Sequence, residues 1–70
     1  LMIRKKMLKG KVKLWQKDKG WGFIEGDDGF DYFFNISNVR NGQKIEVNSE
    51  VKYDAFESQR GPEAENISIC

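Results

Sequence analysis

Charged and apolar residues alternate along residues 9–15, and this period of two predicts a half-buried β-strand, because successive side chains of a strand point to opposite faces. Aromatic and β-branched residues suited to a pleated surface predict two more strands over residues 21–25 and 30–36. The alternation returns at 51–56, and a short apolar pattern at 64–69 predicts a fifth strand. Helical periodicity never extends beyond a turn or two. The pattern therefore favours a small all-β fold.

Turn residues separate the predicted strands. Residues 16–20 are polar and end in glycine, and 26–29 contain Asp-Gly, the strongest short hairpin signal. Residues 37–49 predict an irregular connection with one short helical turn. Residues 58–62 predict a loop in which Pro62 prevents a continuing ladder. Five short strands predict a five-stranded antiparallel barrel, since closure removes the exposed edges of a small open sheet.

Length and composition exclude several classes of protein. Seventy residues amount to one small domain with a thin core, too small to enclose most substrates. The chain has no histidine and a single cysteine, Cys70, which excludes zinc sites, Cys/His nucleophiles and a disulfide scaffold. No apolar run approaches the roughly 20 residues of a membrane span, and there is no signal-peptide core. We therefore expect a cytoplasmic protein without a cofactor, and not an enzyme.

The charges are unevenly distributed along the chain. Residues 1–22 carry eight cations and one carboxylate, whereas residues 23–70 carry four cations and ten carboxylates. A basic half favours an anionic partner, most often nucleic acid, although lysines on strand exteriors also serve as ordinary solvated surface. Residues 1–6 stand apart as a basic N-terminal extension: a cloning remnant, a linker or an electrostatic arm. The predicted domain spans residues 7–70.

Aromatic residues cluster in the first half of the chain, where seven of the nine lie between positions 15 and 34. A thin core cannot bury seven large rings, and exposed rings in a cluster favour a binding surface. The alternation places Val12, Ile24, Tyr32 and Phe34 inside. It places these residues outside: Lys11, Lys13, Trp15, Trp21, Phe23, Phe33 and Asn35. A β-bulge between Leu14 and Trp15 would exchange the faces of these two residues.

An outer face that combines rings and lysines is typical of single-strand binding. Unpaired bases stack on rings at about 1–3 kcal/mol each, with little dependence on the base, and lysines neutralise phosphates. The same face could instead dock a protein, because aromatic residues are also enriched in protein interfaces, although lysine is depleted there. A third alternative is a Mg²⁺-dependent nuclease that uses Asp27, Asp28 and Asp31, but Asp27 and Asp28 are better explained as a solvated hairpin turn.

Four segments, in order along the chain, resemble the cold-shock domain family. Residues 19–24, Lys-Gly-Trp-Gly-Phe-Ile, resemble its first ribonucleoprotein motif, and residues 32–36, Tyr-Phe-Phe-Asn-Ile, stand where it carries the second. Residues 7–13 are similar to a typical bacterial cold-shock opening, and residues 60–67 to its closing loop and last strand. The resemblance covers about residues 7–69.

The resemblance implies a five-stranded OB-type barrel that binds single-stranded RNA or DNA with low sequence preference and acts as an RNA chaperone. We also expect a monomer that does not bind membranes. Carried over by position, the stacking rings would be Trp21, Phe23 and Phe33, with Trp15 beside them. The remaining roles fall on polar residues. Lys13 and Lys19 would meet phosphates or base edges, Asp31 would accept a hydrogen bond from a base, Asn35 would meet a base edge, and Arg60 would close the far end of the groove.

Several positions depart from the family pattern. Leu14 and Trp15 stand where the family has two adjacent aromatics, and Asn35 and Ile36 replace its usual His and Phe. The connection 37–49 carries no ring, and Trp21 replaces a more usual Phe. Because each lost platform removes about 1–3 kcal/mol of stacking, we expect binding weaker than is typical of the family, in the micromolar range.

Overall fold

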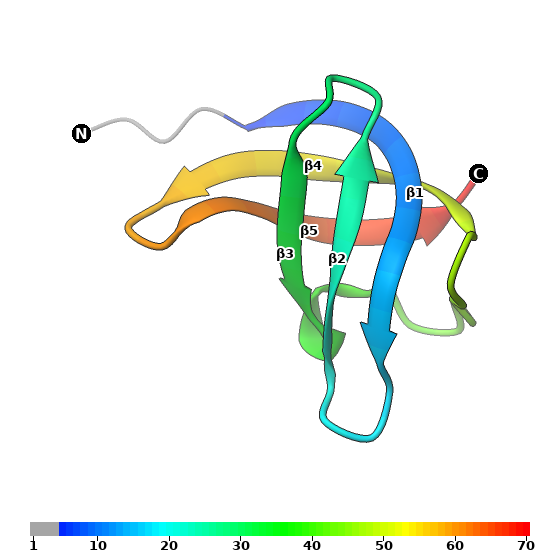
Figure 1. Cartoon of the computed structure of the whole chain (residues 1–70). Helices are drawn as coiled ribbons and strands as arrows, with labels where there is room; N and C mark the ends of the chain where they lie inside the picture. Colours follow the sequence, from blue (N-terminus) through cyan, green and yellow to red (C-terminus); the bar gives the residue numbers. More distant parts are fainter. Residues whose placement is uncertain (1–4) are drawn as a thin grey trace.

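The computed structural model describes residues 5–70, which form five strands and one short 3₁₀ helix (Figure 1). The elements are β1 (Lys6–Gln16), β2 (Trp21–Gly26), β3 (Asp31–Asn35), η1 (Ile36–Asn38), β4 (Glu50–Ser58) and β5 (Gly61–Ile69). The five predicted strands and the short helical turn are confirmed. Residues 5–70 include no helix that is long and apolar enough to cross a membrane.

The strands close into a barrel in the order β1-β2-β3-β5-β4. Four neighbouring pairs are antiparallel, but β3 and β5 run parallel and meet at the pair Phe33 and Glu63. The barrel is thus confirmed, and its fully antiparallel character is corrected. The reason is one of parity, because a closed ring of strands can alternate in direction throughout only if their number is even.

Pro62 lies within β5, contrary to the prediction that it prevents a ladder there. In the β4–β5 register it faces Glu57, while Gly61 faces Ser58. A proline is tolerated in the first residues of a strand, where its missing N–H costs the ladder little. The β4–β5 hairpin is therefore longer than predicted, and it extends beyond the rest of the barrel (Figure 1).

Strand β1 curves around the barrel because it pairs with two different strands (Figure 1). Gly10 lies where the two ladders overlap, opposite Gly26 of β2 and Val51 of β4. A Cβ atom on Gly10 would lie 2.9 Å from the Cα atom of Gly26, closer than real side chains come. Glycine at this position thus permits the close crossing that closes the barrel.

The predicted basic extension, residues 1–6, overlaps the barrel at its end. Lys6 begins β1 and pairs in register with Ala55, and Lys5 forms an ion pair with Glu65. Residues 1–4 of that extension lie outside the described residues.

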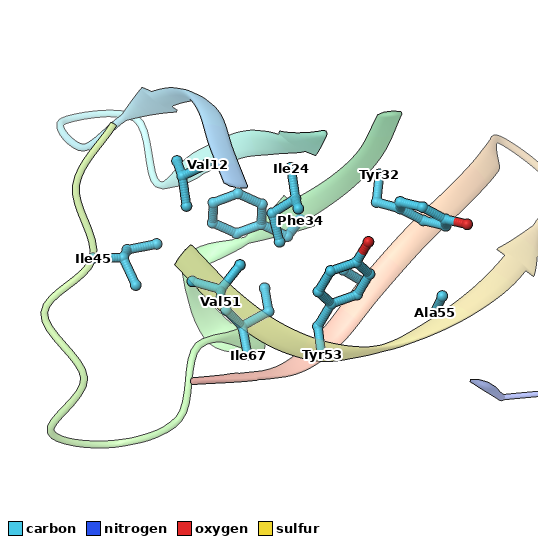
Figure 2. Packing of buried hydrophobic residues seen from close by; sticks show 10 residues of the cluster. Val12, Ile24, Tyr32, Phe34, Ile45, Val51, Tyr53, Ala55 and Ile67 are labelled. Atoms are coloured by element: carbon cyan, nitrogen blue, oxygen red, sulfur yellow. The ribbon is translucent and has the colours of Figure 1, made fainter. Parts of the chain in front are cut away.

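The core fills the barrel with side chains from all five strands and from the connection before β4 (Figure 2). The four residues predicted to point inward, Val12, Ile24, Tyr32 and Phe34, are buried, as expected. The other core residues are Ile45, Val51, Tyr53, Ala55, Ala64 and Ile67. Ile45 lies in the irregular connection and points into one end of the barrel, so this segment is part of the core as well as a link.

Tyr32 and Tyr53 pack against each other in the core, with ring centroids 5.3 Å apart and ring planes tilted by 53°. The Tyr32 hydroxyl donates a 2.5 Å hydrogen bond to Oδ2 of Asp28 in the β2–β3 turn. Burial, followed by this hydrogen bond, raises the pKa of Tyr32 from 10.0 to about 12, and burial also raises the pKa of Tyr53. The folded state therefore favours the protonated form of both phenols.

This shift predicts a loss of stability in alkali. Below pH 10, Tyr32 is protonated in both the folded and the unfolded state, and its full contribution to the free energy of unfolding is present. Between pH 10 and 12 the unfolded state releases the proton first, so the free energy of unfolding falls as the pH rises. We expect Tyr32→Phe to remove part of this fall, measured by urea unfolding at pH 9 and pH 11. The lysines are the same in both proteins, so the difference between the two falls reports on Tyr32. Equal falls in the variant and the parent would contradict the prediction.

Candidate nucleic-acid interface

Three half-buried rings from β2 and β3 form one patch on the outside of the barrel, here called the aromatic surface: Trp21, Phe23 and Phe33. Phe23 and Phe33 are direct cross-strand partners with ring centroids 5.6 Å apart. Trp21 lies 6.1 Å from Phe23 and 6.2 Å from Phe33, nearly parallel to the latter ring. Their place on the outer face follows the predicted alternation, because Gly22 and Ile24 point inward.

Gly22 supports this patch from the inside. A Cβ atom at this position would come within 2.9 Å of Cζ of Phe34 and still closer to the carbonyl oxygen of Leu14. The ring of Phe34 therefore packs directly beneath the backbone of Gly22, between Trp21 and Phe23. This packing supports the part of β2 that carries the two outer rings.

Trp15 lies outside the aromatic surface, contrary to the prediction. The β1–β2 register shifts between Val12 and Leu14, so that Leu14 faces Phe23 and Trp15 faces Gly22. Trp15 stacks on buried Phe34 with centroids 5.3 Å apart and an interplanar angle of 22°. A bulge of this kind reverses the alternation for all residues after it. Leu14 instead takes the position beside Phe23.

Lys13 and Asp31 meet at one border of the aromatic surface. The Lys13 Nζ lies 3.0 Å from Oδ2 of Asp31, across strand β2, and both side chains are about half exposed. Hydrogen bonding to Asp31, and then its charge, raise the pKa of Lys13. Lys19 is exposed in the turn before β2, two residues before Trp21. Two of the predicted polar site residues are thus in contact, and each partly neutralises the other.

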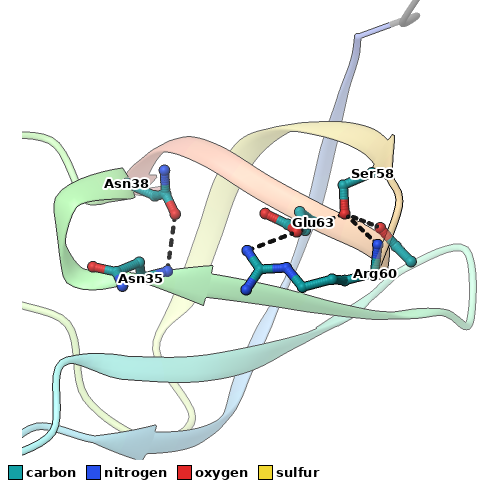
Figure 3. A network of polar contacts seen from close by, with 6 residues as sticks. Asn35, Asn38, Ser58, Arg60 and Glu63 are labelled. Carbon is teal, nitrogen blue, oxygen red and sulfur yellow. Dashed lines mark hydrogen bonds and ion pairs between the residues drawn. The ribbon is translucent and has the colours of Figure 1, made fainter.

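Arg60 reaches the aromatic surface from the β4–β5 turn. Its guanidinium carbon lies 5.5 Å from the centroid of the Phe33 ring, a cation–π distance. Its Nη2 lies 3.3 Å from Oε2 of Glu63, which also accepts a 2.6 Å hydrogen bond from the Ser58 hydroxyl (Figure 3). The structure therefore brings Arg60 beside Phe33, while its role in closing the far end of the groove stays a prediction.

Asn35 caps η1 with its side chain. Its Oδ1 accepts hydrogen bonds from the backbone N–H and the hydroxyl of Ser37, and its own N–H donates to Asn38 Oδ1 at 2.9 Å. Asn35 faces Trp21 in the β2–β3 register and is exposed. Because its oxygen is used by the cap, its amide NH₂ is the group left for a ligand.

The structure contains two hollows that the sequence did not predict, and one of them adjoins the aromatic surface. A slot of about 230 Å³ is lined by Phe23, Asp31, Phe33, Arg60, Pro62 and Glu63. A larger groove of about 490 Å³ lies between Trp15, Ile36 and the connection 39–47. Glu63 belongs to the segment that resembles the family's closing loop, but nothing in the local sequence places its carboxylate next to a ring from β3.

The carboxylates of the nuclease alternative do not converge. Asp28 accepts hydrogen bonds from the Tyr32 hydroxyl and the Phe30 N–H, and Asp31 pairs with Lys13. Within residues 5–70, no group of three histidine, cysteine, aspartate or glutamate side chains is placed to hold a metal ion. The arrangement instead offers flat apolar faces, flanking cations and a few hydrogen-bonding groups.

Comparisons with known proteins agree with this geometry. The family model described as "'Cold-shock' DNA-binding domain" matches residues 8–70. Cold shock protein 1 of Lactiplantibacillus plantarum is 40% identical over 63 residues, 87% of this chain and 96% of that protein. The major cold shock protein of Streptococcus pyogenes serotype M1 is 42% identical over 64 residues, 89% of this chain and 96% of that protein.

A solved structure shares the fold. The chain titled "drosophila Unr CSD456" superimposes with a TM-score of 0.78 at 21% identity, over 93% of this chain and 27% of that one. The family match covers nearly all of the barrel, and the relatives are matched over nearly their whole length. With the ring-bearing β2–β3 pair and the closed five-stranded barrel, these matches show that the chain belongs to the cold-shock domain family, a family of nucleic-acid-binding domains.

Proposed function

We propose that this protein binds single-stranded RNA and DNA on the aromatic surface, with low sequence preference, and acts as an RNA chaperone by trapping unpaired strands. The observation that carries the proposal is the contact among Trp21, Phe23 and Phe33, which offers neighbouring stacking platforms at the spacing of a continuous strand. Duplex nucleic acid cannot use these platforms, because its bases are already stacked and paired.

The flanking cations supply the electrostatic part of the binding. Lys13 lies at the border of the aromatic surface, Arg60 lies over Phe33, and Lys19 stands two residues before Trp21. All three are exposed, so they can pair with phosphates and release the counterions of the strand. Asp31 and Glu63 offset two of these cations in the free protein. A phosphate that pairs with Lys13 or Arg60 must therefore compete with a carboxylate, which adds to the reasons for expecting micromolar affinity. In this role the protein binds strands and catalyses no reaction.

The test is the fluorescence of Trp21 during titration with an eight-residue oligothymidylate at low and at physiological salt. Trp21 belongs to the aromatic surface, whereas the half-buried Trp15 is stacked on Phe34, so we expect the larger part of the quenching from Trp21. We expect saturable quenching, with the logarithm of the association constant falling linearly as the logarithm of the salt concentration rises. A matched duplex should leave the emission unchanged.

Two outcomes would contradict the proposal. Absence of quenching at high micromolar strand would show that the positions Leu14, Asn35 and Ile36 have disabled the groove, and docking of a protein on the aromatic surface would become the leading alternative. Equal binding of the duplex would show a general affinity for polyanions instead.

A further inference from the structure

The slot at the Arg60 end of the aromatic surface has the shape of a site for a single flat ring. Phe23, Phe33 and Pro62 supply its apolar walls, and its volume of about 230 Å³ is below the usual range for pockets that hold larger ligands. The slot shares Phe23 and Phe33 with the aromatic surface, so a strand stacked there would place one of its bases at the slot. This inference therefore rests on the proposed function.

Glu63 is the fixed polar group of this slot. Its side chain is only 12% exposed, and Oε2 is held by the Ser58 hydroxyl at 2.6 Å. The hydroxyl of Ser58 gives its one proton to Glu63 and accepts a hydrogen bond from the Arg60 N–H at 3.1 Å, so the turn holds the hydroxyl in place and the hydroxyl in turn holds the carboxylate (Figure 3). Among the described residues, Oε1 of Glu63 accepts no hydrogen bond. A preorganised carboxylate thus lines the slot, with one oxygen available to a donor of a base that enters it.

Arg60 is the movable group. Its side chain is 77% exposed, and it lies over the Phe33 ring that a base would use. A base that stacks on Phe33 replaces the guanidinium there, and Oε2 of Glu63 then keeps its bond to Ser58 and regains one acceptor site. The displaced Arg60 remains close enough to the strand to meet a phosphate. When a base displaces Arg60, the nearly buried carboxylate of Glu63 loses its ion pair and requires hydrogen-bond donors from the base.

Only one of the common bases presents two adjacent donors on its Watson–Crick edge. Guanine carries N1–H and N2–H₂ side by side, which match the two oxygens of a carboxylate. Adenine and cytosine place a ring acceptor next to their amino group, and uracil and thymine place a carbonyl on each side of N3–H. Asp31, at the other side of the slot, adds a second acceptor and no donor. A carboxylate that contacts two adjacent positions of the edge therefore meets an acceptor on every common base except guanine, where N1–H and N2–H₂ are both donors.

We infer that Glu63, positioned by Ser58, makes this slot a guanine-selective subsite within an otherwise unselective strand-binding surface. A bidentate contact to a base edge discriminates by at least about fivefold. One guanine moved stepwise along an eight-residue oligothymidylate should strengthen binding by that factor at one position only. Adenine or cytosine at the same position should give no such gain.

Base analogues test the contact in the unmodified protein, by the same fluorescence titration. Replacing the guanine by inosine removes N2–H₂ and keeps N1–H, so the gain should disappear. 7-Deazaguanine keeps the whole Watson–Crick edge and should keep the gain. If inosine binds as tightly as guanine, or if no position of guanine strengthens binding while the plain oligothymidylate still binds, the inference is wrong and the proposed function stands. If no strand binds at all, both fail.

A charge-matched pair of variants tests the assignment to Glu63. Glu63→Gln should bind guanine-containing and plain strands equally, because a carboxamide offers one acceptor and one donor. Glu50→Gln makes the same change of charge at an exposed position that lines a different hollow, and should keep the guanine preference. A preference that survives in Glu63→Gln, with folding confirmed by circular dichroism, would overturn the role of Glu63.

Discussion

Replacement of Trp21 and Phe33 together by alanine is expected to lower the affinity for single strands by roughly 30-fold or more, because two stacking platforms at about 1–3 kcal/mol each are lost and 1.4 kcal/mol is a factor of ten. The two rings are nearly parallel and 6.2 Å apart, so they present neighbouring faces to successive bases. Because they contact each other, the loss in the double variant need not equal the sum of the single losses.

The measurement is the fluorescence anisotropy of an end-labelled oligothymidylate, which does not depend on Trp21. Phe30→Ala is the matched control: Phe30 is 61% exposed, precedes β3 and is not one of the contacting rings. It should bind within about twofold of the parent. Loss of binding in Phe30→Ala, or parental affinity in the double variant, would show that strands bind elsewhere on the barrel.

Phe34→Ala is expected to unfold much of the protein at 37 °C. Truncation of a buried phenylalanine costs about 3–5 kcal/mol, whereas at about 0.05–0.15 kcal/mol per residue a domain of this size is stabilised by only about 4–10 kcal/mol in total. Phe34 has no exposed surface and fills the space between the Trp15 ring and the backbone at Gly22. Its loss leaves a cavity directly beneath the aromatic surface.

Urea unfolding followed by circular dichroism measures this effect, and Trp15 emission gives an independent report, since the ring loses its stacking partner. Phe34→Leu keeps part of the volume and should lose clearly less stability. A free energy of unfolding for Phe34→Ala within 1 kcal/mol of the parent would show that the barrel collapses around the cavity, and that the Trp15–Phe34 pair is not central to the core.

The strands themselves could be predicted because their signals are local. Alternation and turn residues act over a few positions, so β2, β3 and the Asp-Gly turn between them follow from neighbouring residues alone. The same alternation correctly predicted Val12 and Ile24 as core and Phe23 as outer face, and the cold-shock resemblance was confirmed over residues 8–70.

Local patterns do not record the register shift in β1, the parallel β3–β5 pair, or the meeting of the β4–β5 turn with Phe33, because all three depend on contacts between distant segments. The register shift after Val12 turned Trp15 toward the core, where the half-buried ring stacks on Phe34, and turned Leu14 to the outer face. The partner strands decide where such a shift occurs. The parallel β3–β5 pair exists only because five strands close a ring.

Arg60 and Glu63 stand about thirty residues from Phe33 in the chain, and only that closure brings them to its ring. The sequence by itself thus determined which residues form strands and which types of side chain are available for binding. The tertiary structure decided which of those side chains meet, since register and closure are settled by the packing of the whole barrel and not by any one segment.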